Sequence, residues 1–188
     1  MDGRIPRLGL LLLALAFLPA CHFKAGVGDP SQAKVDPALS GYWVLPEGAT
    51  IFHLVPTADG RTYDVKYFAA GGTLAAPTKK DAFFVKGQAW LTMIGETRFA
   101  TFKVTEPEFD VPFSVFKVGS RGDNLTLAPL NQDFEPFRIA KTTAAMESAV
   151  KENLKNPDAF QDKGVFRRSS AEATAAVRAL FGEMDVRS

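Results

Sequence analysis

The stretch FFVKGQAWLTMIGETRFATFKV (residues 83–104) reads as two β-strands around a tight turn. Residues 83–94 and 98–104 are rich in aromatic and β-branched side chains, and Gly95-Glu96 suits a type II′ turn, in which glycine takes a positive φ. This turn would give one face the pairs Leu91/Ala100 and Ala89/Phe102, and the other face Trp90, Phe99 and Ile94. Since both faces carry bulky apolar groups, we expect the pair to be covered on both sides, or to face a cavity or a helix.

A second hairpin precedes this one. Residues 51–55 and 62–68 flank Asp59-Gly60, a common hairpin turn. Pairing Leu54 with Val65, and Phe52 with Tyr67, puts the apolar side chains on one face. The predicted register leaves His53, Asp64 and Lys66 on the polar face.

A third hairpin follows, over residues 113–118 and 125–130, joined through 119–124. We expect Val118 to face Leu125, and Phe116 to face Leu127. These three hairpins, with a first strand candidate at residues 39–45, place the predicted strands over about 42–130.

From Lys141 the apolar spacing becomes helical. It predicts one helix over about 143–155 and another over about 170–181, and Ser169 and Glu172 have the spacing of a capping box for the second. Residues 165–167 suit one further short strand. The sequence therefore predicts a mainly β, α+β domain: an antiparallel curved sheet or barrel of seven or eight strands with two C-terminal helices.

The N-terminus predicts export and lipid attachment. Arg4 and Arg7 precede an uncharged apolar run of 11 residues, 8–18, which is too short to span a bilayer as a helix. Leu18-Pro19-Ala20-Cys21 then resembles a bacterial lipobox, and this resemblance implies a signal peptide over 1–20 and a lipid, with acyl chains such as palmitate, on Cys21. The alternative is an ordinary secretory signal peptide that is cleaved near Ala20.

Cleavage before Cys21 would leave 168 residues with 20 basic and 20 acidic side chains. A neutral chain with scattered charges does not favour nucleic acid as a partner. Residues 21–39 contain Gly, Pro and Lys without an apolar period and predict a flexible tether that reaches about 60 Å when extended. Residues 40–188 then form a single domain. The resemblance to bacterial lipoproteins also implies that His22 after the cysteine, rather than Asp, favours sorting to the outer membrane, facing the periplasm, in a cell with two membranes.

Gly41-Tyr42-Trp43 is similar to the Gly-x-Trp motif that opens lipocalin-type barrels. In that family the Trp plugs the closed end of the barrel and packs against a late Arg, a position that Arg167 or Arg168 would fill. The similarity covers three residues, and a core Trp in another type of sheet explains them equally well. Together with the lipobox, it resembles small lipocalin-like β-barrel lipoproteins.

Catalytic and metal-binding patterns are sparse. His53 is the one histidine available for a hydrolytic triad, and the chain has no Gly-x-Ser-x-Gly motif. A carboxylate pair would have to come from the loop acids Glu96, Glu106, Glu108 and Asp110. No Cys/His cluster or calcium-loop spacing is present, so we expect no catalytic residues, no metal and no cofactor.

The sequence thus favours a noncatalytic, membrane-anchored envelope lipoprotein. Its expected partners are the membrane, through Cys21, and a small apolar ligand or an envelope protein at a face containing Trp43, Trp90 and Phe99. The alternative is an envelope hydrolase that uses His53 or the loop carboxylates.

Overall fold

The computed structural model describes residues 23–45, 49–73, 76–105 and 113–170, together with 175, 178, 179, 181 and 182; for 71–73 and 76–82 we describe the backbone alone. The lipobox, His22 and three of the four loop acids, Glu106, Glu108 and Asp110, lie outside the described residues.

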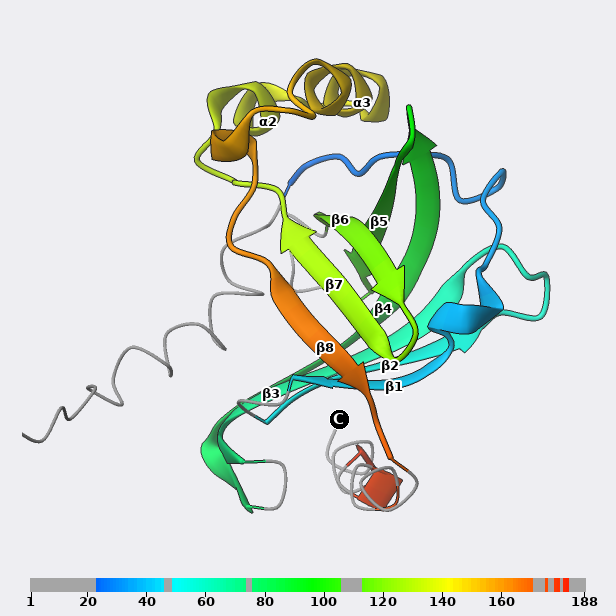
Figure 1. Cartoon of the computed structure of the whole chain (residues 1–188), viewed down its shortest axis with the longest axis vertical. Helices are drawn as coiled ribbons and strands as arrows, with labels where there is room; N and C mark the ends of the chain where they lie inside the picture. Colours follow the sequence, from blue (N-terminus) through cyan, green and yellow to red (C-terminus); the bar gives the residue numbers. More distant parts are fainter. Residues whose placement is uncertain are drawn as a thin grey trace, which may run out of the picture.

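Eight antiparallel strands form a closed barrel in which each strand pairs with the next and the last pairs with the first (Figure 1). The strands are β1 (Gly41–Leu45), β2 (Ala49–Pro56), β3 (Tyr63–Thr73), β4 (Ala76–Ile94), β5 (Thr97–Val104), β6 (Phe113–Arg121), β7 (Asn124–Pro129) and β8 (Gly164–Arg168). A 3₁₀ helix, Pro37–Leu39, leads into β1. Of the two predicted architectures, the chain thus adopts the barrel, and residues 165–167 lie in its eighth strand.

Two of the predicted hairpins have the expected register. Leu54 faces Val65 and Phe52 faces Tyr67, while Ala89 faces Phe102 and Leu91 faces Ala100. Gly95 has a φ of 60°, as the first central residue of a type II′ turn requires. No described residue other than glycine has a positive φ, so Glu96 does not, which also fits this turn type.

The predicted pairing of the third hairpin is wrong by two residues. Val118 faces Leu127, and Phe116 faces Pro129. The strands continue to Arg121 and Asn124 because Gly122, with a φ of 57°, allows a two-residue turn where we expected a six-residue loop. A shift of two residues leaves every side chain on its expected face.

The helix predicted over about 143–155 is present, but a short unpredicted helix precedes it, and the helices do not all follow the strands. The helices α2 (Glu135–Ile139) and α3 (Thr143–Glu152) lie between β7 and β8, so both precede the last strand. Thr142 caps α3 by accepting a hydrogen bond from the Ala145 amide. Within the helix predicted over 170–181, the described residues 175, 178, 179 and 181 are helical, and Ser170 is not.

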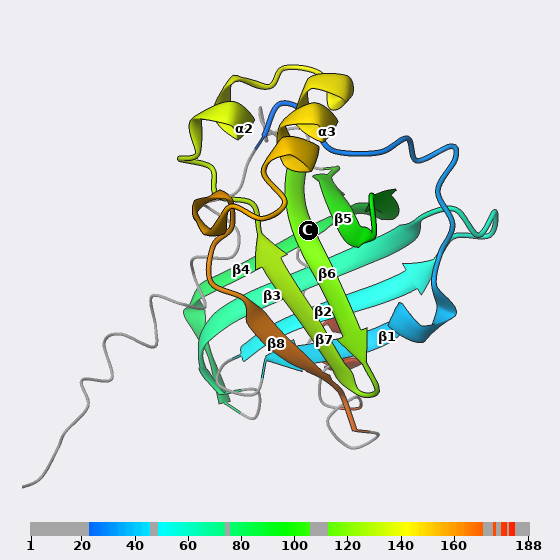
Figure 2. The same cartoon turned by 45° about the horizontal axis from the view of Figure 1, so that its top comes forward.

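Apolar side chains fill the inside of the barrel, and other parts of the chain cover its outer wall. The inner cluster includes Trp43, Tyr67, Phe102 and Phe166, whereas Ile94, Phe99 and Val115 face outward and cluster with residues of α2 and α3. Figure 2 shows these two helices beside the barrel. A second outer cluster contains Ile51, Phe68 and Phe181. The two apolar faces of the strands therefore both have buried packing partners.

Residues 23–39 are not a free tether, which corrects the prediction for this segment. Phe23, Ala25 and Val27 are buried against the outer wall of the barrel. The indole Nε1 of Trp90 donates a hydrogen bond to the carbonyl oxygen of Val27 at 2.7 Å. Thr101 Oγ1 accepts from the Val27 amide at 3.0 Å and donates to its carbonyl at 2.8 Å. The segment stays bound because these buried backbone groups find partners on the wall.

Candidate functional site

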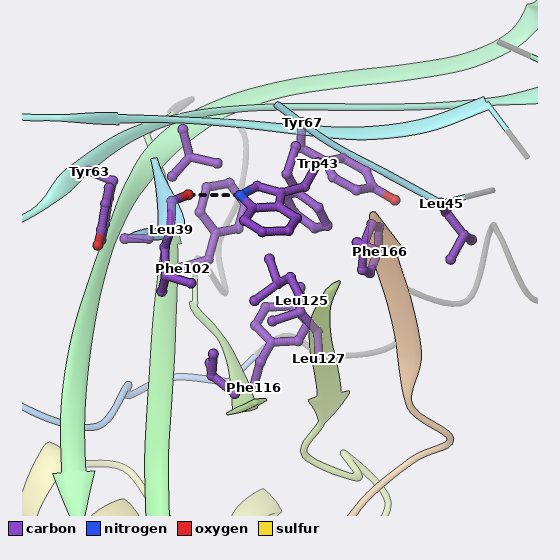
Figure 3. Close-up of a cluster of buried hydrophobic side chains, with 14 of the residues drawn as sticks. Leu39, Trp43, Leu45, Tyr63, Tyr67, Phe102, Phe116, Leu125, Leu127 and Phe166 are labelled. Carbon is purple, nitrogen blue, oxygen red and sulfur yellow. Dashed lines mark hydrogen bonds between the residues drawn. The ribbon is translucent and has the colours of Figure 1, made fainter. Parts of the chain in front are cut away.

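One end of the barrel is closed by Trp43 on β1. Its Nε1 donates a hydrogen bond to the carbonyl oxygen of Leu39, at 2.8 Å, so the 3₁₀ helix is held across the barrel end (Figure 3). The guanidinium of Arg168, on β8, lies over the indole ring. Of the two arginines suggested for this contact, Arg168 makes it, and Arg167 is exposed. This pairing confirms the Trp-Arg contact that the Gly-x-Trp similarity implied.

The barrel interior is apolar and almost filled. Side chains from six strands and Leu39 line a cavity of about 50 Å³, among them Phe52, Val65, Phe102 and Phe116. A cavity of this size holds one or two waters, whereas small-molecule sites occupy about 300–1,000 Å³. The space resolved between the described residues therefore does not fit a small apolar ligand.

Three buried hydroxyl groups also face the interior, on Thr50, Tyr67 and Ser114. None of them has a hydrogen-bond partner among the described residues. Burial raises the pKa of Tyr67 well above its usual value, because the phenolate would have to form without water. These hydroxyl groups therefore lose their hydrogen bonds to water on folding without gaining one to a described residue.

A much larger hollow lies at the rim of the barrel, and Leu91 lines both this hollow and the interior cavity. The larger hollow measures about 580 Å³ and runs between the segment 28–37 and the β4–β5 hairpin. Apolar side chains, including Val35, Leu91 and Met93, alternate there with the charged side chains of Asp29, Lys34, Asp36 and Arg98. Met93 is 58% exposed. We call this hollow the outer groove.

Polar contacts hold the walls of the outer groove in place. Arg98 Nη1 lies 2.7 Å from Asp36 Oδ2. The hydroxyl of Tyr63 donates to the Asp36 carbonyl at 2.8 Å and accepts from the Asp36 amide at 2.6 Å. Burial raises the pKa of Tyr63 to about 12, so this hydroxyl stays neutral at physiological pH. At the other end of the groove, Glu147 Oε1 accepts a hydrogen bond from the Gly28 amide at 2.8 Å.

Trp43, Trp90 and Phe99 do not form the expected binding face, which corrects that prediction. Trp43 and Phe99 have no exposed surface, and Trp90 is only 5% exposed. Trp43 lies inside the barrel, while Phe99 packs under the helices and Trp90 under Val27. Large aromatic groups on both faces of a strand pair were needed for two separate cores.

His53 lies on the outer wall, stacked on Tyr42 with ring centroids 3.8 Å apart. Phe181 is 6.3 Å from the imidazole centroid. Burial, with smaller contributions from Lys66 and Arg178, lowers the pKa of His53. No hydrogen bond joins His53 to a carboxylate or hydroxyl of the described residues, so this part of the structure offers it no catalytic partner.

The remaining candidate groups are dispersed. Glu96 is exposed in the β4–β5 turn. Within the described ranges, no three His, Cys, Asp or Glu side chains are grouped as a metal site. Nor does that part of the chain contain a helix with the length and apolar character needed to span a membrane.

The fold thus places the chain in the class of closed, antiparallel eight-stranded barrels, consistent with a lipocalin-like barrel. Comparisons with protein-family models, with curated proteins and with solved structures found no match.

Sequence reasoning missed the outer groove. Its two walls come from segments about sixty residues apart, since Asp36 and Arg98 are separated by 62 positions. A short-range signal was nonetheless present: Phe23, Ala25 and Val27 alternate with Lys24 and Gly26, as in a strand with one buried face. This alternation could have predicted that the segment binds to the barrel.

Proposed function

We propose that this protein is a lipid-anchored, noncatalytic binding protein of the bacterial envelope, with a lipocalin-like barrel. The lipobox-like Leu18-Pro19-Ala20-Cys21 supports a lipid on Cys21, and His22 supports the outer membrane, facing the periplasm. The Trp43-Arg168 contact at the closed barrel end supports the lipocalin-like barrel.

The proposed binding role rests on the difference in volume between the outer groove and the interior cavity. The outer groove measures about 580 Å³ and is open to solvent, whereas the interior cavity measures about 50 Å³. Binding sites favour the larger concave surface with apolar side chains and a few convergent polar groups. We therefore favour a protein partner at the outer groove over a small apolar ligand inside the barrel.

The chemistry of the outer groove fits an extended peptide segment of an envelope protein. Val35, Leu91 and Met93 supply apolar contacts for side chains. The charged groups include both signs, from Lys34 and Arg98 to Asp29, which suits a peptide better than a polyanion. A preformed groove also reduces the entropy lost on binding.

A comparison of two exposed apolar positions tests this role. Met93→Asp alters the outer groove, and Val165→Asp alters β8, where Val165 is 42% exposed. After crosslinking in intact envelopes, we expect the unchanged protein and Val165→Asp to retain the same partner and Met93→Asp to lose it. Equal retention by both variants would place the partner elsewhere. A lipid that copurifies in equimolar amount would instead favour the small-ligand alternative.

The anchor has its own test. Cys21→Ala removes the thiol that would receive the lipid, so the chain should leave the membrane fraction. Detection of the acyl chains by mass spectrometry of the N-terminal peptide checks the modification directly. A Cys21→Ala protein that stays with the membrane would contradict lipid attachment at this residue.

A further inference from the structure

The distance between the proposed lipid and the folded domain is set by Phe23. Its amide donates a hydrogen bond to the Phe113 carbonyl at 2.7 Å, and the Phe113 amide donates back at 3.3 Å. The Phe23 side chain is 3% exposed. Phe23, two positions after Cys21, is therefore held against the barrel wall.

Two residues cannot separate the barrel from a bilayer. The chain advances at most about 3.3–3.6 Å per residue, so Phe23 lies within about 7 Å of the Cys21 backbone. The thiol of Cys21 would be joined to glycerol at the level of the lipid headgroups. The domain is then held against the leaflet, where a free segment over 21–39 would have allowed it to stand away.

Helix α2 is the element next to this attachment point. The Phe23 and Phe137 rings meet edge to face, with centroids 6.4 Å apart. The described chain starts beside α2 in both cartoon views (Figures 1 and 2). Because Phe137 points inward, Ile139, two residues further along the helix, points out and is 60% exposed.

The charges around Ile139 are compatible with a lipid surface. Lys24, Arg138 and Lys141 are exposed next to it in the chain or the fold, while Asp133 and Glu135 supply the opposing negative charges. Arg138 and Glu135 lie 4.0 Å apart and are both well exposed. The small excess of positive charge adds little, so the contact depends on the anchor and on the apolar side chain.

We propose that α2 lies on the phospholipid leaflet that holds the Cys21 lipid, with Ile139 among the headgroups. This inference rests on the proposed lipid anchor and adds a fixed orientation to it. One isoleucine alone would not hold a soluble protein on a bilayer. A two-residue link, however, keeps α2 at a high effective concentration beside the lipid, so a weak contact is populated.

Site-directed quenching tests this orientation. The lipidated full chain carries an environment-sensitive fluorophore at Ile139→Cys or, as the matched control, at Arg61→Cys, with Cys21 already consumed by lipid. Arg61 is exposed in the β2–β3 turn, and this turn lies well away from α2 in both views. In vesicles of phosphatidylethanolamine and phosphatidylglycerol with spin-labelled lipid, we expect several-fold stronger quenching at position 139. Equal quenching at the two positions would overturn the proposal.

A longer link between Cys21 and Phe23 is the second test of the proposal. About ten Gly and Ser residues inserted after His22 should leave flotation with the vesicles unchanged and lower the quenching at position 139 toward that at position 61. Quenching that survives the insertion would overturn the role of the short link. Vesicle flotation tests the anchor separately. If the chain floats but the fluorophore at position 139 is not quenched, only the orientation is refuted. If the chain does not float, both the anchor and the orientation are refuted.

Discussion

The guanidinium of Arg168 lies over the indole ring of Trp43, with its central carbon 4.4 Å from the ring centroid. The two residues face each other on β8 and β1, the strands whose pairing closes the barrel. The same guanidinium donates hydrogen bonds to the carbonyl oxygens of Ser40, at 2.8 Å, and Ala38, at 2.5 Å. One side chain thus joins the last strand, the first strand and the 3₁₀ helix that covers the barrel end.

We expect Arg168→Ala to lower the free energy of unfolding by about 2–4 kcal/mol, because it removes a cation–π contact and two charge-assisted hydrogen bonds. The ion pair with Asp123 adds little, since the Asp123 side chain is 85% exposed. Urea unfolding followed by Trp fluorescence measures the change. The neighbouring Arg167→Ala is the control, because Arg167 is exposed and should change stability by less than about 0.5 kcal/mol. Similar losses in both variants would argue against the closing role of Arg168.

Gly28 and Gly60 form a matched pair for the packing of the N-terminal segment. Both have a positive φ, of 78° and 67°, so alanine at either should cost about 1–2 kcal/mol. A Cβ at Gly28 would also overlap the Thr92 side chain, whereas one at Gly60 meets nothing within 4 Å. We therefore expect Gly28→Ala to cost more and to increase hydrogen exchange at the Val27 amide. Equal costs, with Val27 still protected, would show that the segment adjusts freely.

Loss of the hydroxyl should lower the free energy of unfolding at Tyr63 but not at Tyr67, although both tyrosines are buried. Tyr63→Phe removes both hydrogen bonds to the Asp36 backbone and should destabilise the protein by about 1–3 kcal/mol. Tyr67→Phe removes a hydroxyl without a described partner, so we expect a neutral or stabilising effect. Denaturant unfolding at neutral pH compares the two variants. A clear loss of stability in Tyr67→Phe would reveal a bound water or ligand inside the barrel.

His53 should make the protein less stable as the medium becomes acidic. Its pKa in the folded protein is lowered from 6.5, mainly by burial, so the unfolded chain takes up this proton first. Between pH 6.5 and the lower pKa of the folded protein, the unfolded state binds more protons than the folded state. The free energy of unfolding therefore falls as the pH decreases from 6.5 through the folded pKa. Unfolding midpoints at about pH 7.5 and pH 5.5 should differ less for His53→Gln than for the unchanged protein. An identical pH dependence would mean that His53 does not contribute.

The hairpins could be predicted because their signals are local. Asp59-Gly60 and Gly95-Glu96 mark turns, and the two-residue alternation around them sets the faces. The β6–β7 register was wrong because Gly119 and Gly122 both suit a turn, and a shift of two residues leaves the same apolar pattern. Local patterns therefore determine which face is buried more firmly than where a turn falls.

The candidate site was less predictable than the fold. Trp90 and Phe99 were predicted to share a face, and they do, but their exposure depended on what covered that face. The covering groups are Val27 and the helices, which are distant from the hairpin in the chain. An aromatic face therefore indicates a buried surface without indicating whether the same chain or a partner buries it.

Composition and spacing alone were enough for the hairpin faces, for a mainly antiparallel sheet and for the expectation of a lipid on Cys21, because each depends on residues close together in the chain. Barrel closure through Trp43 and Arg168, and the outer groove between Asp36 and Arg98, required contacts between distant segments. Such contacts form only when the gain from packing exceeds the entropy lost in closing long loops, and that balance is a property of the whole fold.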